Sequence, residues 1–147
     1  MPQSLVKILT HIVFSTKNRA NLIKPEIENE LYAYIHGIIE NNGAKLIIAN
    51  GTENHSHLLV SLGRNEVGDL IGDIKRNSSS WIKKKGVRDF YWQRGYGAFS
   101  IGQSQVPEVS RYIRDQKEHH RGQAYEDEFR ALCRKYDVGI EERYCWD

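Results

Sequence analysis

Hydrophobic positions along the 147 residues follow two different periods, one typical of strands and one typical of helices. Short runs rich in β-branched and aromatic residues predict four strands, at Lys7–Phe14, Ala44–Asn50, His55–Leu62 and Phe90–Ile101. Gly95 and Gly97 interrupt the last of these runs. The turn signal Asn50-Gly51 joins the second and third strands in a predicted antiparallel hairpin.

Between the strands, apolar residues recur at the three- and four-residue spacing of amphipathic helices. One predicted helix begins at Pro25 and ends at Asn42-Gly43, and a second runs from Val67 towards Gly86. The order β-α-β-β-α-β predicts a ferredoxin-like α+β fold, an antiparallel sheet with two helices on one face and the other face free for a ligand. Two appended helices are predicted at about Pro107–His120 and Tyr125–Tyr136. No linker separates them from the core, so we expect a single domain of residues 1–147.

Composition narrows the class of protein. Hydrophobic residues make up 39% and charged residues 27%, which argues against a disordered or fibrous chain. No run approaches the roughly 18 apolar residues of a membrane span, and the N-terminal residues lack the features of a secretory signal, so we expect a cytoplasmic protein. Cys133 and Cys145 lack metal-type spacing and suit a reducing compartment.

Charge adds one further hint. The net charge of +2 is only mildly basic, but basic residues cluster between Lys83 and Arg94, and Arg111 and Arg114 flank Tyr112. Such a cluster permits a polyanion partner, although taken alone it is more typical of a solvated helix end. The residues that we expect to contact such a polyanion are Lys17, Arg19, Arg94, Arg111 and Arg114.

Two pairs of residues could carry chemistry. His55 and His57 are two apart in a predicted strand, so both imidazoles point to the same face and can reach one metal ion. Tyr112 and Gln116 are four apart in a predicted helix, which places them on one face about 6 Å apart. Each pair alone also fits a simpler interpretation: polar residues at a strand end in the first case, and a packed tyrosine in the second.

Together the two pairs suggest phosphodiester chemistry. Two neutral imidazoles and an amide oxygen neutralise none of the charge of a divalent cation, so such a site should be weak until anionic phosphate oxygens arrive. The phenol of Tyr112 would then supply the nucleophile. Because a phosphotyrosine link keeps the energy of the broken bond, the hydroxyl of another strand can attack it. Cleavage and joining would be one reaction run in two directions.

Taken together, these residues and their neighbours resemble a known family. It is the single-tyrosine HUH transposases of the insertion-sequence 200/605 type, including those associated with repetitive extragenic palindromes. One departure is Ser56, where the family usually has a bulky hydrophobic residue. This side chain should face away from the ligands, so the change should weaken packing rather than metal binding. The resemblance rests on five segments in order, namely Thr10–Arg19, Glu53–Val60, Trp92–Ser100, Arg111–His120 and the closing Asp137–Asp147.

The resemblance implies a transposase, dependent on Mg²⁺ or Mn²⁺, that binds hairpins in single-stranded DNA, cuts beside them and rejoins the ends. By matched position, His55, His57 and Gln116 would be the metal ligands and Tyr112 the nucleophile. Such enzymes are typically homodimers. The family also includes domesticated proteins that act on host repeats, so mobility of an element does not follow.

Two other functions are alternatives to a transposase. A non-catalytic single-stranded DNA or RNA binding module would hold nucleic acid on the aromatic residues of its sheet, Tyr91, Trp92, Tyr96 and Phe99. A two-histidine phosphoesterase would need a second His-x-Ser/Thr strand, which the sequence lacks. His119 and His120 diverge in a helix and are expected to face solvent, and Asp115 and Glu118 are interpreted as surface charges.

The segment Gly102–Val106 is a polar connector between the sheet and the helix of Tyr112. It allows that helix to dock on its own sheet, or to cross a dimer interface and complete the site of the partner. Resemblance to the dimeric family favours the exchanged arrangement.

Overall fold

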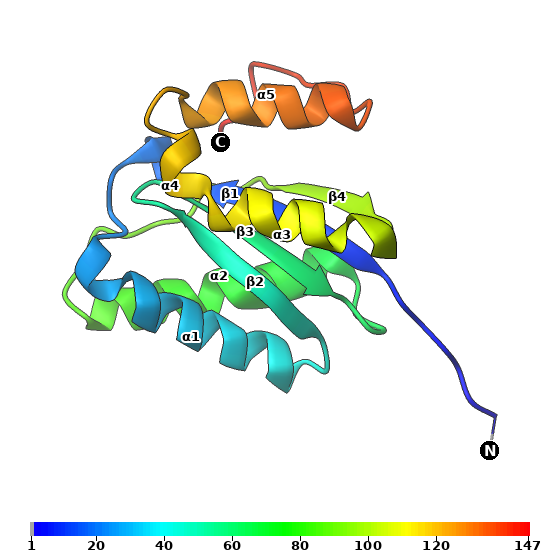
Figure 1. The fold of residues 1–147 in the computed structure, drawn as a ribbon. Coiled ribbons are helices and arrows are strands. Elements are labelled where there is room, and N and C mark those ends of the chain that lie inside the picture. Colours follow the sequence, from blue (N-terminus) through cyan, green and yellow to red (C-terminus); the bar gives the residue numbers. More distant parts are fainter. Residues whose placement is uncertain (1) are drawn as a thin grey trace.

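A four-stranded antiparallel sheet organises the chain in the computed structural model, which describes residues 2–147 (Figure 1). Along the sheet the strands run in the order β2-β3-β1-β4, and α1 and α2 connect them in the β-α-β-β-α-β sequence. The predicted ferredoxin-like fold is therefore confirmed. The bounds are β1 Leu9–Ser15, α1 Pro25–Asn41, β2 Lys45–Thr52, β3 His55–Ser61, α2 Val67–Lys84 and β4 Gly97–Ile101.

The face of the sheet that carries α1 and α2 holds the larger hydrophobic core. Alternate residues of β1 and β3, such as Ile12, Phe14 and Leu58, are fully buried against the apolar sides of these helices. Burial of each such side chain stabilises the fold by about 1.5–3 kcal/mol before entropy is counted. Because the period of a strand is two, the intervening residues of β1 and β3 must face the opposite side.

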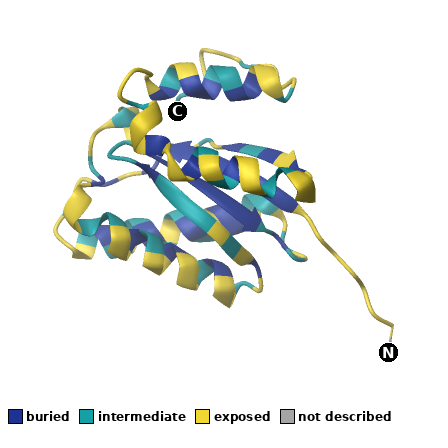
Figure 2. Ribbon diagram, viewed as in Figure 1, coloured by how far each residue is buried: buried dark blue, intermediate teal, exposed yellow. Residues whose placement is uncertain are grey.

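The opposite face of the sheet is not free, contrary to the expectation from the sequence. It is covered by α3 (Val106–Arg114), α4 (Gln116–His119) and α5 (Tyr125–Lys135), which lie above the sheet in Figure 1. The helices cover this face because it is apolar. Val13, Leu59 and Phe99 point to this side and are buried under the helices. Figure 2 shows buried and exposed residues alternating along α5, the pattern of a helix that covers a sheet with one side.

A glycine in β4 lets α5 approach the sheet closely. A Cβ atom on Gly97 would lie 2.8 Å from a ring carbon of Phe129, which is a steric clash. Phe129 packs with Val13 and Tyr125 in a buried cluster. This packing fixes the first turn of α5 over the middle of the sheet.

The helix predicted at Pro107–His120 is broken in two. Asp115 has φ −93° and ψ 20°, and it separates α3 from α4. The side-chain amide of Asn50 in β2 donates hydrogen bonds to the carbonyls of Ile113 and Arg114, at 3.1 and 2.9 Å. These carbonyls would otherwise accept from the next helical turn, so a side chain from a distant strand helps to end α3.

The fourth strand is shorter than predicted, because residues 90–96 lie outside β4 and Trp92 forms only an isolated bridge with Thr16. Lys75 of α2 explains part of this difference. Its ammonium donates to the carbonyls of Gln93 and Gly95, at 2.9 and 2.6 Å, and so uses acceptors that a strand would need. Within residues 2–147, no helix combines the length and the apolar character that crossing a membrane requires.

Candidate active site under the C-terminal helices

The two histidines of the H-x-H motif lie on the face of β3 that α3, α4 and α5 cover. His55 pairs with Ser15 and His57 with Val13 in the β1–β3 ladder. Both residues are fully buried, and their ring centroids are 5.2 Å apart. The structure thus places both imidazoles on one side of the sheet, as the strand period requires.

Tyr112 and Gln116 reach the histidines from above, despite the break between their helices. The side-chain oxygen of Gln116, which is buried, lies 3.1 Å from Nε2 of His55. Tyr112, on α3, is half-buried, and its hydroxyl donates a hydrogen bond to Oε2 of Glu128. The four residues singled out in the sequence therefore meet in one place.

Glu128 of α5 contacts all four of these residues, although it was not among the residues expected from the sequence. Its Oε1 lies 3.3 Å from Nε2 of His55 and 3.0 Å from Nε2 of His57. Its Oε2 accepts hydrogen bonds from Tyr112 and, at 3.0 Å, from the amide of Gln116. A signal was present, because Glu128 is an acidic residue within the apolar stripe that Tyr125 and Phe129 begin.

His120 is the second missed residue, and the expectation that it faces solvent is wrong. Its side chain is only 9% exposed, and its Nε2 lies 2.9 Å from Oε1 of Glu128. The expectation failed because it assumed an unbroken helix, whereas α4 ends at His119 and the chain then turns back. His119, Asp115 and Glu118 are exposed, as expected.

His11 of β1 stands behind this cluster. Its Nε2 lies 2.8 Å from Nδ1 of His57, and both side chains are buried. Burial and the neighbouring His57 lower the pKa of His11 to about 3, so its imidazole is neutral at physiological pH. In the sequence, His11 differs from its neighbours only as a polar residue in an apolar run, and nothing there indicated a role for it.

The electrostatics keep Glu128 ionised and Tyr112 protonated. Burial opposes ionisation of Glu128, but hydrogen bonds with His120, His55 and His57 outweigh it and hold the pKa of this carboxyl well below its usual range. Burial, together with the charge of Glu128, raises the pKa of the Tyr112 phenol above its usual range. As it stands, the site therefore holds an orientated phenol that is not yet a nucleophile.

Ser56 points to the opposite face of β3, as expected. Its hydroxyl lies 2.9 Å from the hydroxyl of Tyr32 on α1, and the residue is fully buried. The tyrosine fills the space beside the small side chain. A polar pair thus replaces the apolar contact that a bulky residue would make at this position.

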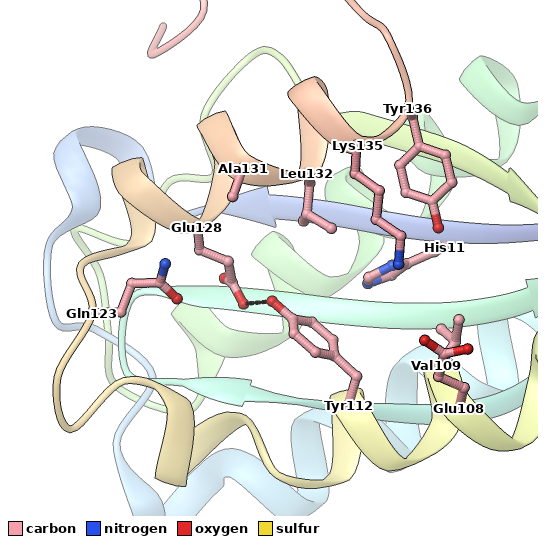
Figure 3. A pocket seen from close by; sticks show the side chains of 10 residues that line it. All are labelled: His11, Glu108, Val109, Tyr112, Gln123, Glu128, Ala131, Leu132, Lys135 and Tyr136. Carbon is pink, nitrogen blue, oxygen red and sulfur yellow. Dashed lines mark hydrogen bonds between the residues drawn. The ribbon is translucent and has the colours of Figure 1, made fainter.

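A cavity of about 300 Å³ gives access to Tyr112. Its walls include His11, Tyr112 and Glu128, and Figure 3 shows the phenol and the carboxylate pointing towards each other. Lys135 of α5 also lines it and brings a positive charge to the wall. The cavity is therefore a place where an anionic group could approach the phenol.

The basic residues expected to contact DNA are divided between two regions. Lys17 and Arg94 line a second cavity of about 580 Å³. Arg19, at the end of the short helix Lys17–Arg19, donates a hydrogen bond to the carbonyl of Trp146 at 2.7 Å. Arg111 and Arg114 are exposed on α3 instead.

Helix α3, which carries Tyr112, docks on the sheet of its own chain. The connector forms the short helix Gln103–Gln105, and α3 then packs against β2 and β3. One chain thus brings His55, His57, Tyr112 and Gln116 together without an exchanged helix. The exchanged arrangement favoured by the resemblance is not needed to complete the site.

Comparison with known proteins identifies the family. The family described as "Transposase IS200 like" matches residues 4–116, which is more than half of the chain, so the protein belongs to the IS200-like transposase family. No curated protein matches the sequence. The protein is therefore a DNA-processing enzyme of the kind that carries out recombination.

Two solved structures share the fold. One is a proposed transposase from Deinococcus radiodurans R1, with a TM-score of 0.64 and 18% identity, covering 79% of this chain and 95% of that chain. The other is a REP-associated tyrosine transposase bound to a REP hairpin, with a TM-score of 0.63 and 14% identity, covering 82% of this chain and 73% of that chain. At such identities the similarity establishes a common fold.

Proposed function

We propose that this protein is an HUH-type tyrosine transposase that cleaves and rejoins single-stranded DNA beside hairpins, through a covalent phosphotyrosine at Tyr112. The observation that carries the proposal is the meeting of a phenol, an amide and the H-x-H imidazoles around one buried carboxylate. Membership of the transposase family supports it. The hairpin in the complex of the related enzyme suggests the form of the DNA.

The donor atoms fit a divalent ion. His55 and His57 offer imidazole nitrogens and Gln116 an amide oxygen beside them, and we propose these three as ligands of Mg²⁺ or Mn²⁺. When bound, such an ion would polarise the phosphoryl group and stabilise the charge that develops during the displacement.

The residues of the chain then have separate roles. The phenol oxygen of Tyr112 forms a bond to phosphorus while the bond from phosphorus to the leaving strand breaks, and the oxygen of that strand takes a proton from water to become a hydroxyl end. Oε2 of Glu128 already holds the phenol hydrogen and is placed to receive the proton as the new bond forms. In the reverse direction the same atom returns the proton to Tyr112 when the hydroxyl of another strand attacks the link.

The charged residues suggest how the DNA is held. Lys135 beside Tyr112 could contact the phosphate that reacts, while Lys17 and Arg94 could hold backbone phosphates farther along the strand. Because such contacts release counterions, binding should weaken steeply as salt is raised. The expected contacts of Arg19, Arg111 and Arg114 with DNA, and the cytoplasmic location, stay predictions.

The binding-module alternative is less well supported. A stacking platform needs exposed aromatic faces, but Trp92 and Phe99 are only 8% and 4% exposed and belong to the two cores. Tyr91 and Tyr96 are exposed, but they lie outside the face of the sheet that such a module would use. The buried His-Gln-Glu network beside a tyrosine is unexplained by binding alone.

The direct test is formation of a covalent adduct. Single-stranded oligonucleotides that contain hairpins are incubated with the protein and Mg²⁺ or Mn²⁺, and the products are separated on a denaturing gel. We expect a protein-DNA band that resists denaturation, and no such band in excess EDTA. The same oligonucleotides as full duplexes are the control. A full yield of adduct in EDTA would exclude the metal-dependent mechanism.

We propose a homodimer whose subunits each hold a complete site of their own. A His57→Ala subunit and a Tyr112→Phe subunit, purified together through different tags, should then cleave no more DNA than either variant alone, because each site carries one lesion. Recovery of cleavage in the heterodimer would instead demonstrate the exchanged helix.

A further inference from the structure

Four atoms that could bind one metal ion lie close together, and two of them come from residues outside the H-x-H motif. A nitrogen of His55, His57 and His120 and a carboxylate oxygen of Glu128 all lie within 4.8 Å of one another. Three Nε2 atoms approach the same oxygen, Oε1 of Glu128, at 3.3, 3.0 and 2.9 Å. The two added residues lie after Gln116, where the match to the family ends.

The other ring nitrogens of two of these histidines are already occupied. Nδ1 of His55 lies 2.8 Å from the side-chain oxygen of Asn54, and Nδ1 of His120 lies 2.6 Å from the carbonyl oxygen of Gln123. Both partners are acceptors, so each Nδ1 donates a hydrogen bond. Nε2 of each ring is therefore the nitrogen that is directed at the carboxylate of Glu128 and available to a metal ion.

His57 can adopt the same tautomer. Its Nδ1 lies 2.8 Å from Nε2 of His11, which can accept a hydrogen bond from it. In this arrangement Nε2 of His57, which faces Glu128, is the nitrogen available to a metal ion. Metal-binding histidines commonly have their second nitrogen held in this manner, because the outer partner fixes both the tautomer and the ring orientation.

The distances match a shared cation. An ion between the Nε2 atoms and Oε1 of Glu128 would take the place of the hydrogens that join these atoms in the metal-free protein. Neighbouring ligand atoms bound to one ion at about 2.1 Å lie roughly 3.0–3.4 Å apart, which is close to the three distances to Oε1 of Glu128.

We propose that His120 and Glu128 join His55 and His57 as ligands of a single divalent transition-metal ion, which the free protein binds in the absence of DNA and in preference to Mg²⁺. Three imidazoles suit Mn²⁺, Co²⁺ or Zn²⁺, whereas Mg²⁺ favours oxygen ligands and retains water. The carboxylate also removes the reason for expecting a weak site, because the free protein already supplies a negative charge. This inference deepens the proposed function: it adds His120 and Glu128 to the proposed ligands and narrows the ion from Mg²⁺ or Mn²⁺ to a transition metal. The metal site nevertheless stands on its own geometry.

The test titrates the metal-free, full-length protein with Co²⁺ and follows visible absorption, which reports nitrogen ligands. We expect binding of one equivalent, unchanged by Mg²⁺ at about a hundredfold excess. Glu128→Gln and His120→Asn should each weaken Co²⁺ binding by about tenfold or more. The matched controls are Glu40→Gln and His36→Asn, from an exposed His-Glu pair at 3.0 Å on α1, and both should bind Co²⁺ like the wild type.

A second measurement uses only the wild-type protein, in case a variant fails to fold. X-ray absorption of the Zn²⁺-loaded protein should count three imidazole ligands. A count of two, absence of the Co²⁺ band, displacement by Mg²⁺, or equal losses in the control pair would each overturn the proposal. None of these readouts involves DNA. A protein that passes them but forms no DNA adduct would therefore disprove the transposase mechanism and leave the metal site intact.

Discussion

Replacement of Tyr112 by phenylalanine should eliminate the covalent adduct and lower the rate of strand cleavage by about a thousandfold or more, because it removes the nucleophilic oxygen. The fold should survive. Only the hydrogen bond to Glu128 is lost, at a cost of about 1 kcal/mol, and the ring keeps its packing. Cleavage is measured with hairpin oligonucleotides, and hairpin binding is measured separately to show that it stays close to that of the wild type.

Tyr96→Phe is the matched control for this experiment, since Tyr96 is an exposed tyrosine outside the cluster. It should leave the yield of adduct unchanged. If instead the adduct persisted in Tyr112→Phe and disappeared in Tyr96→Phe, the nucleophile would have to be reassigned to Tyr96.

Removal of either motif histidine should have an effect of similar size. His55→Ala or His57→Ala takes away a metal ligand and leaves a buried carboxylate without one of its partners, so cleavage should fall to the background level. Binding of single-stranded DNA should persist, because basic residues supply most of its affinity. Gel cleavage assays and fluorescence anisotropy separate the two quantities.

His36→Ala provides the control for the two histidine variants. It changes a histidine that is exposed on α1 and should preserve cleavage. Circular dichroism is needed for His55→Ala and His57→Ala, because both remove a fully buried side chain. A folded His57→Ala protein with wild-type cleavage would exclude the proposed role of the H-x-H motif.

Local sequence patterns were sufficient to predict the sheet and half of the site. Alternation in β3 placed His55 and His57 on one face, since a strand has a strict period of two. Tyr112 and Gln116 both reach the site despite the break at Asp115, because only this residue separates the end of α3 from the start of α4. Both pairs are close in sequence, so local geometry decides their orientation.

The other half depends on tertiary structure. The break in the helix involves a hydrogen-bond donor from β2, Asn50, which no local pattern reveals. The position of His120 follows from that break and from the turn that comes after it. Glu128 reaches the site only because α5 docks against Gly97 and Phe99, and this contact spans distant segments of the chain.

The end of the family match at Gln116 divides the candidate site between two parts of the chain. The strand with the histidines and the helix with the tyrosine belong to the shared part of the chain, whereas His120 and Glu128 belong to the segment beyond it. Exchange of this terminal segment would replace two of the proposed metal ligands and leave the H-x-H strand and the helix of Tyr112 unchanged. Chimeric proteins made at this junction would then test separately the proposed DNA cleavage and the proposed choice of metal.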